Sequence, residues 1–128
     1  MTFVGFSNHF LVPTAPLSFE VSSSTTTSLT LAWLDPISNG GAAVTNFQLE
    51  KFSNSAYSII YTGTAKTFTS TGLSAGTAYQ FRVAAINSQG IGAYATGTFS
   101  TDASTPATGN SLPFNETLYV QFPPLPPI

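Results

Sequence analysis

The stretch Tyr79-Gln80-Phe81-Arg82-Val83-Ala84-Ala85 decides the fold class, because apolar residues occupy every second position along it. With a period of two, Tyr79, Phe81 and Val83 share one face of a strand. A strand with one apolar face covers a core on one side and meets water on the other, which is typical of antiparallel sheets. The stretch therefore predicts a half-buried β-strand.

Two earlier stretches repeat this alternation. In the stretch that ends at Trp33, the residues Leu29, Leu31 and Trp33 share one face, and in the next stretch Phe47 and Leu49 point inward together. No part of the chain has a convincing helical period. The middle of the chain is therefore expected to be all β.

Turn-forming residues separate the strand-like stretches. They are Asp35-Pro36, Asn39-Gly40-Gly41, Gly72, Ser74-Ala75-Gly76 and Asn87-Ser88-Gln89-Gly90. Seven strands are expected between them, near residues 17–22, 28–34, 44–52, 57–62, 66–71, 78–87 and 93–101. Seven short strands in roughly 90 residues predict a two-sheet antiparallel sandwich.

The order of these features resembles a fibronectin type III domain. That family has a Trp on its second strand, then a Pro, an Asn-Gly-Gly-like turn and an aromatic-x-aliphatic third strand. The matching residues here are Trp33, Pro36, Asn39-Gly40-Gly41, Phe47 and Leu49. The resemblance implies a seven-stranded antiparallel two-sheet sandwich over residues 13–103.

The stretch Leu73-Ser74-Ala75-Gly76-Thr77-Ala78-Tyr79 is similar to the tyrosine corner of that family, in which the Tyr hydroxyl bonds to nearby backbone. One residue departs from the family pattern, because Ser70 stands where an aliphatic residue is usual. The alternation and the resemblance together predict a structural core of Trp33, Phe47, Leu49, Leu73, Tyr79, Phe81 and Val83.

Two apolar arms flank the expected sandwich. Residues 1–12 form an uncharged N-terminal arm, and residues 104–128 form a linker followed by a Pro-rich apolar C-terminal arm. Burying a large apolar side chain is worth about 1.5–3 kcal/mol, so such arms are expected to dock. The residues expected to bind a partner are Phe3, Phe6, Phe10, Leu11, Leu118, Tyr119, Val120, Phe122, Pro124 and Pro127. The strand-like stretch Thr117–Phe122 could also add to a sheet edge.

Composition excludes several function classes. The chain has 128 residues, a formal net charge of −2, and only 6% charged residues. Three basic residues give no footprint for a nucleic-acid backbone or an anionic membrane, so neither partner is expected. Cysteine is absent, which excludes disulfides and thiolate chemistry.

Residues suited to catalysis are few, so no enzyme, cofactor or metal is expected. His9 is the only histidine and cannot form a transition-metal site without other ligands. The carboxylates Glu20, Asp35, Glu50, Asp102 and Glu116 are scattered along the chain. Glu50 is expected on an outward face, where an exposed charge keeps a sheet soluble.

Three functions remain open. The main hypothesis is a virion structural protein of a tailed phage, assembled in the host cytoplasm. In it the arms bind capsid or other virion proteins, as in a head decoration protein or a neck, tail or fibre component. Self-association and weak contact with host-surface glycans are left open. The alternatives are a spacer or carbohydrate-adhesion module of a bacterial extracellular protein, and a eukaryotic adhesion module. The initial Met and the lack of an export signal are taken to indicate a complete gene product.

Overall fold

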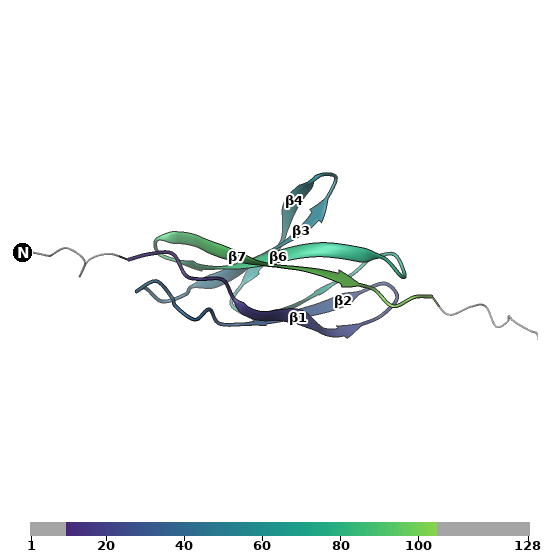
Figure 1. Ribbon diagram of the computed structural model, residues 1–128, viewed down its shortest axis with the longest axis horizontal. Coiled ribbons are helices and arrows are strands. Elements are labelled where there is room, and N and C mark those ends of the chain that lie inside the picture. Colours follow the sequence, from purple (N-terminus) through teal and green to yellow (C-terminus); the bar gives the residue numbers. More distant parts are fainter. Residues whose placement is uncertain (1–9, 105–128) are drawn as a thin grey trace, which may run out of the picture.

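Seven strands pack as two antiparallel sheets in the computed structural model, which describes residues 10–104 (Figure 1). The strands are β1 (Leu17–Ser24), β2 (Leu29–Leu34), β3 (Asn46–Ser53), β4 (Ala56–Gly63), β5 (Thr67–Ser70), β6 (Ala78–Asn87) and β7 (Gly90–Ser100). The predicted seven-stranded sandwich is therefore confirmed.

The two sheets differ in size. One sheet has three strands in the order β1-β2-β5, and the other has four in the order β4-β3-β6-β7. In the larger sheet, Phe47 lies opposite Ala85 and Leu49 lies opposite Val83. This register sets the apolar faces of β3 and β6 side by side, so that both point at the smaller sheet.

The core lies between the sheets and is built around Trp33. The indole ring makes edge contacts with Phe19 and Phe47, with ring centroids 6.2 Å and 5.9 Å apart. Of the residues that the sequence places in the core, the buried ones are Trp33, Phe47, Leu49, Leu73, Phe81 and Val83. Tyr79 is only partly buried and packs against this cluster.

Tyr79 closes the tyrosine corner implied by the family resemblance. Its hydroxyl oxygen accepts a hydrogen bond from the backbone N–H of Ser74 at 2.8 Å. That hydrogen bond lowers the pKa of Tyr79 from its ordinary value. The next residue back, Leu73, is buried, and its N–H donates to the carbonyl of Thr27 at 2.9 Å. The corner thus ties the start of β6 to the β1–β2 turn.

The last strand begins earlier than the sequence predicts, at Gly90 instead of residue 93. Asn87 pairs directly with Gly90, which leaves Ser88 and Gln89 as a two-residue hairpin turn. Gly90 has a φ of 135°, a conformation that L side chains rarely adopt. The expected loop at this position is therefore a tight hairpin.

The β3–β4 hairpin projects from the body of the sandwich (Figure 1). Its turn consists of Asn54 and Ser55, with positive φ values of 53° and 67°. Two positive φ angles are what a type I′ turn requires, and this turn matches the twist of the flanking strands. The described chain enters the sandwich at one end and leaves it at the other, as the figure also shows.

Candidate functional site

Residues 10–14, which we call the strap, lie against the end of the sandwich where the chain enters. The N–H of Leu11 donates to the carbonyl of Gly40 at 2.7 Å, and the N–H of Thr14 donates to the carbonyl of Ser38 at 3.0 Å. On the other side, the N–H of Ala93 donates to the carbonyl of Pro13 at 3.4 Å. The strap therefore bridges the β2–β3 loop and the start of β7.

The buried side chain of Asn87 also holds the strap in place through hydrogen bonds. Its side chain is 4% exposed, and its Nδ2 donates to the carbonyls of Leu11 and Asn39, at 2.7 Å and 2.8 Å. Its Oδ1 accepts from the N–H of Gln89 at 2.8 Å. One buried amide thus satisfies three backbone groups and joins the strap, the β2–β3 loop and the β6–β7 turn.

Two glycines let the strap come this close. A Cβ atom at Gly40 would overlap the carbonyl oxygen of Leu11, and one at Gly92 would overlap that of Pro13. Gly40 also has a φ of +79°, which a side chain would strain. The strap is therefore held by backbone-to-backbone contact along its length.

Three of the strap's apolar side chains, those of Phe10, Leu11 and Val12, are exposed although its backbone is bonded, whereas Pro13 is fully buried. Leu11 is 65% exposed, and Ile37 in the adjacent β2–β3 loop is 82% exposed. Val12 lies next to the start of β7, since a Cβ at Gly90 would stand 3.8 Å from its Cγ1. We call the exposed side chains at this end the apolar pole, which comprises Phe10, Leu11, Val12, Ile37 and Ile91.

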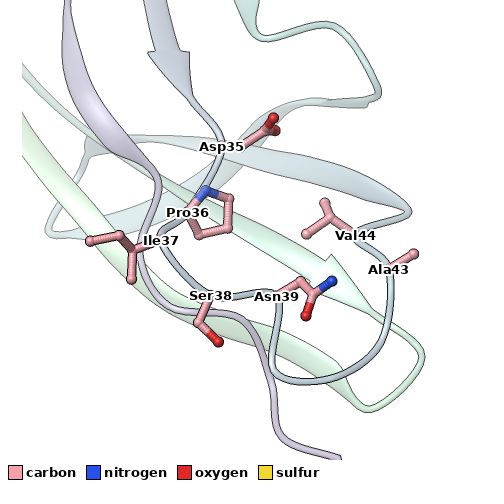
Figure 2. Close-up of a pocket in the computed structure, with 7 residues that line it drawn as sticks. All are labelled: Asp35, Pro36, Ile37, Ser38, Asn39, Ala43 and Val44. Carbon is pink, nitrogen blue, oxygen red and sulfur yellow. The ribbon is translucent and has the colours of Figure 1, made fainter.

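A hollow of about 630 Å³ opens beside the apolar pole. Figure 2 shows that one loop, from Asp35 to Val44, curves round it and supplies every labelled side chain. The carboxylate of Asp35 is paired with Lys66 at 3.2 Å, so the rim carries no unpaired charge from this residue. The lining combines apolar Pro36 and Val44 with short polar groups, which suits an apolar side chain from a partner.

Glu50 lies on the outer face of the larger sheet, but the expectation that it is exposed is wrong. It is 5% exposed because Arg82, Tyr94 and Gln48 cover it. Arg82 donates to Oε1 through Nε at 3.0 Å and Nη2 at 2.8 Å. The Tyr94 hydroxyl donates to Oε2 at 2.8 Å. Burial raises the pKa of Glu50, but these bonds outweigh it, and the net pKa lies below its ordinary value.

Two aromatic rings enclose the Arg82 guanidinium. Its Cζ lies 4.0 Å from the Tyr57 ring centroid and 3.9 Å from that of Tyr94. Burial and the bond to Glu50 raise the pKa of Tyr94. The cluster is internally paired in charge and hydrogen bonds, so it offers stability to the sheet and no free catalytic group.

The candidate partner-binding residues are only partly described. Phe10 and Leu11 belong to the apolar pole, whereas His9 lies outside the described residues. The other arm residues, which also lie outside the described residues, are Phe3, Phe6, Leu118, Tyr119, Val120, Phe122, Pro124 and Pro127. Within residues 10–104, no three His, Cys, Asp or Glu side chains come together to hold a metal ion.

Sequence analysis missed the roles of Asn87 and Arg82. Asn87 ends a strand before a Ser-Gln-Gly turn, which looks like ordinary turn chemistry. Arg82 occupies an outward position of β6 opposite Glu50, and their pairing depends on the β3–β6 register. The pairing of Arg82 with Glu50 could be predicted only from the register between β3 and β6.

In the described part of the chain, no helix has the length and apolar character needed to span a membrane.

Comparison with known proteins matches the fold. The family model described as "Fibronectin type III domain" matches residues 14–101. Exoglucanase B of Cellulomonas fimi is 30% identical over 99 residues, which are 77% of this chain but 9% of that protein.

Solved structures agree with this match. The fourth FNIII domain of a human protein has a TM-score of 0.68 and 27% identity, and the alignment covers 85% of this chain and 96% of that one. The sixth fibronectin type III domain of human fibronectin type III domain containing protein 3 has a TM-score of 0.66 and 28% identity. This alignment covers 77% of this chain and 94% of that one.

Proposed function

This chain belongs to the fibronectin type III family, and from that membership we infer that it is a non-catalytic spacer module of a bacterial extracellular protein. Domains of this family are typically non-catalytic. The exoglucanase similarity supports the bacterial extracellular setting, because a matching segment occurs there as a small part of a much longer protein. The activity of that enzyme is not carried over to this chain.

The observation that carries the proposal is the placement of the two chain ends. Polypeptide enters at the strap and leaves after β7 at the opposite end, so whatever precedes and follows is held apart (Figure 1). The bonds of the strap to Gly40, Ser38 and Asn87 fix the direction in which the chain enters. A spacer needs both features, because a loose entry would let the neighbouring module swing.

The packing of Tyr57 and Tyr94 on the outer face of the larger sheet favours a spacer over a carbohydrate-adhesion module. Glycan-binding surfaces commonly stack sugars on free aromatic faces. Here Arg82 covers one face of Tyr57 and one of Tyr94, and Phe52 packs edge-on against Tyr57 with centroids 5.1 Å apart. The guanidinium thus occupies a face of each ring on which a sugar could otherwise stack.

The apolar pole supplies the contact with a neighbouring module. Its side chains are presented by a bonded backbone, so little ordering entropy is lost when a partner covers them. Leu11 and Ile37 stand at its most exposed positions. A neighbour with an uncharged apolar end would bury them beside the hollow lined by the β2–β3 loop.

A chimera tests the spacer function. The matched segment of exoglucanase B is replaced by residues 10–104 of this chain, and a second chimera carries a Gly-Ser linker of equal length. We expect the sandwich chimera to keep the parent's activity on an insoluble glucan and the linker chimera to lose part of it. Equal loss in both would contradict the spacer function, as would glucan hydrolysis by this chain alone.

A pair of variants in the same chimera tests the apolar pole. Ile37→Asp introduces a charge at the pole, whereas Glu20→Gln changes an exposed residue on β1. We expect Ile37→Asp to make the junction with the preceding module more flexible in small-angle X-ray scattering, and Glu20→Gln to leave it unchanged. Identical scattering profiles for the two variants would show that the apolar pole does not contact the preceding module.

A virion structural protein is the second candidate function. It is favoured by the exposed Phe10 and Leu11, which continue into an uncharged arm that carries Phe3 and Phe6. Under this proposal the arm binds capsid or other virion proteins. Mass spectrometry of purified particles of a phage that encodes this chain would detect it as a stoichiometric component, and its absence from every particle fraction would reject the role.

A further inference from the structure

We propose that the free edge of β4 binds the segment Thr117–Phe122 of the same chain as an added strand. β4 is an outer strand of the four-stranded sheet, so one side of its backbone is unpaired within residues 10–104. An unpaired edge presents a row of N–H and C=O groups that an extended segment can bond. The inference does not depend on the proposed spacer function.

The other three edges of the described sandwich are less open. β1 is broken by two register shifts and contains Ser18 at a positive φ of 52°, and β5 has four residues. β7 is bonded by the strap through Ala93 and packs beside β1, where Phe19 and Phe99 lie 5.3 Å apart. β4 has eight residues, no charge, no proline and one register shift against β3. It is therefore the least protected edge.

An apolar surface lies next to this edge. Ile59 on β4 is 58% exposed, and Phe52 on β3, directly opposite Tyr57, is 40% exposed. The neighbouring Glu50 and Arg82 form an ion pair, with Nη2 of Arg82 2.8 Å from Oε1 of Glu50, so this surface carries no net charge from them. An occupant of this surface must thus be extended, uncharged and apolar on one face.

The segment Thr117–Phe122 meets each of these requirements. It lies outside the described residues, and its sequence contains no charge. As a strand it would place Leu118, Val120 and Phe122 on one face, where they could cover Ile59 and Phe52. Pro123 and Pro124 follow immediately and cannot donate to a ladder, so the added strand would end there.

The connection is long enough for one chain to do this. In the order β4-β3-β6-β7, a strand added beyond β4 lies four strand spacings from β7, about 19 Å at about 4.8 Å each. Residues 105–116 can span up to about 40 Å when extended, which suffices for either strand direction. A segment tethered so closely has an effective concentration in the millimolar range, which favours the same chain over a second copy.

Hydrogen exchange of the full chain tests the proposal. Alternate amides of β4 point away from β3 and exchange quickly unless another strand bonds them. We expect these amides and those of residues 117–122 to exchange at least about tenfold more slowly than free amides. Val120→Pro, which removes an N–H from the added strand, should abolish both protections, whereas Thr108→Pro in the linker should preserve them.

The acceptor surface is tested by a second pair of variants. Ile59→Lys places a charge beside the edge and should release the segment, and Ile37→Lys, at a more exposed site on another part of the molecule, should not. Fast exchange of the outward β4 amides in the unmodified chain would overturn the proposal. A dimer in light scattering that dissociates on Val120→Pro would overturn the same-chain assignment.

Discussion

At the residue scale, Glu50 is the only charged side chain that is buried among residues 10–104. Its burial costs hydration, and four hydrogen bonds from Gln48, Arg82 and Tyr94 offset that cost. Removing one member of such a cluster leaves the others unsatisfied in a partly dry site. The cluster therefore stabilises the contact between β3, β6 and β7 instead of keeping the sheet soluble.

The Glu50 cluster predicts a pH dependence of stability. The hydrogen bonds hold the folded-state pKa of Glu50 below its ordinary value of 4.5, so the carboxylate stabilises the fold above that value. This contribution is lost as the pH falls through the folded-state pKa. Glu50→Gln should lower the free energy of unfolding at pH 7 by about 1–3 kcal/mol and flatten its decline below pH 4.5.

Urea unfolding at pH 7 and at pH 3 measures both effects. The matched control is Glu20→Gln, because Glu20 is exposed on β1. A Glu50→Gln protein whose stability falls with pH as steeply as that of the unmodified chain would show that Glu50 is not the responsible group.

Gly40 and Gly72 form a matched pair for the strap contact. Both have positive φ, at +79° and +71°, so a substitution to Ala at either position costs about 1 kcal/mol of stability through backbone strain. A Cβ at Gly40 would also overlap the Leu11 carbonyl oxygen, whereas one at Gly72 would meet nothing within 4 Å. In thermal unfolding, Gly40→Ala should therefore cost about 1–2 kcal/mol more than Gly72→Ala. Equal losses would mean that the strap does not lie against Gly40 in solution.

At the scale of elements, alternation in three stretches and turn residues between the others predict seven strands, and the structure has seven at these places, with the start of the last one shifted to Gly90. The stretch Tyr79–Ala85 became β6, and its inward residues Phe81 and Val83 are buried. The strap could not be predicted in this way, because Pro13 is its one buried side chain and its backbone makes most of the contacts. Backbone pairing between segments far apart in sequence leaves no periodic pattern when only one side chain of the segment is buried.

Asn87 should control the strap as a unit. Asn87→Asp keeps the oxygen that accepts from Gln89 but replaces the donor to the Leu11 and Asn39 carbonyls with a second acceptor. We expect the amides of Leu11 and Thr14 to lose their slow hydrogen exchange while those of β6 keep theirs. Retained protection at Leu11 would show that the bonds to Gly40 and Ser38 suffice without the buried amide.

At the scale of the whole molecule, strand alternation and the family resemblance predict the sandwich, whereas the proposed function rests on the positions of the two chain ends. With 6% charged residues, one histidine and no cysteine, the chain offers no group of catalytic side chains from which a reaction could be predicted. The apolar N-terminal arm was expected to bind a partner, and Phe10 and Leu11 do lie exposed at the apolar pole. Which partner covers them depends on chemistry that lies outside this chain, so its sequence holds no record of it.

A spacer must hold its two chain ends apart in fixed positions. The absence of cysteine allows spin labels to be placed at Val12→Cys and Ser104→Cys, which are exposed sites near opposite ends. Double electron–electron resonance then measures the distance between them. We expect one narrow peak at or above about 36 Å, the length of an eleven-residue strand such as β7. A broad distribution, or a peak well below that length, would contradict it.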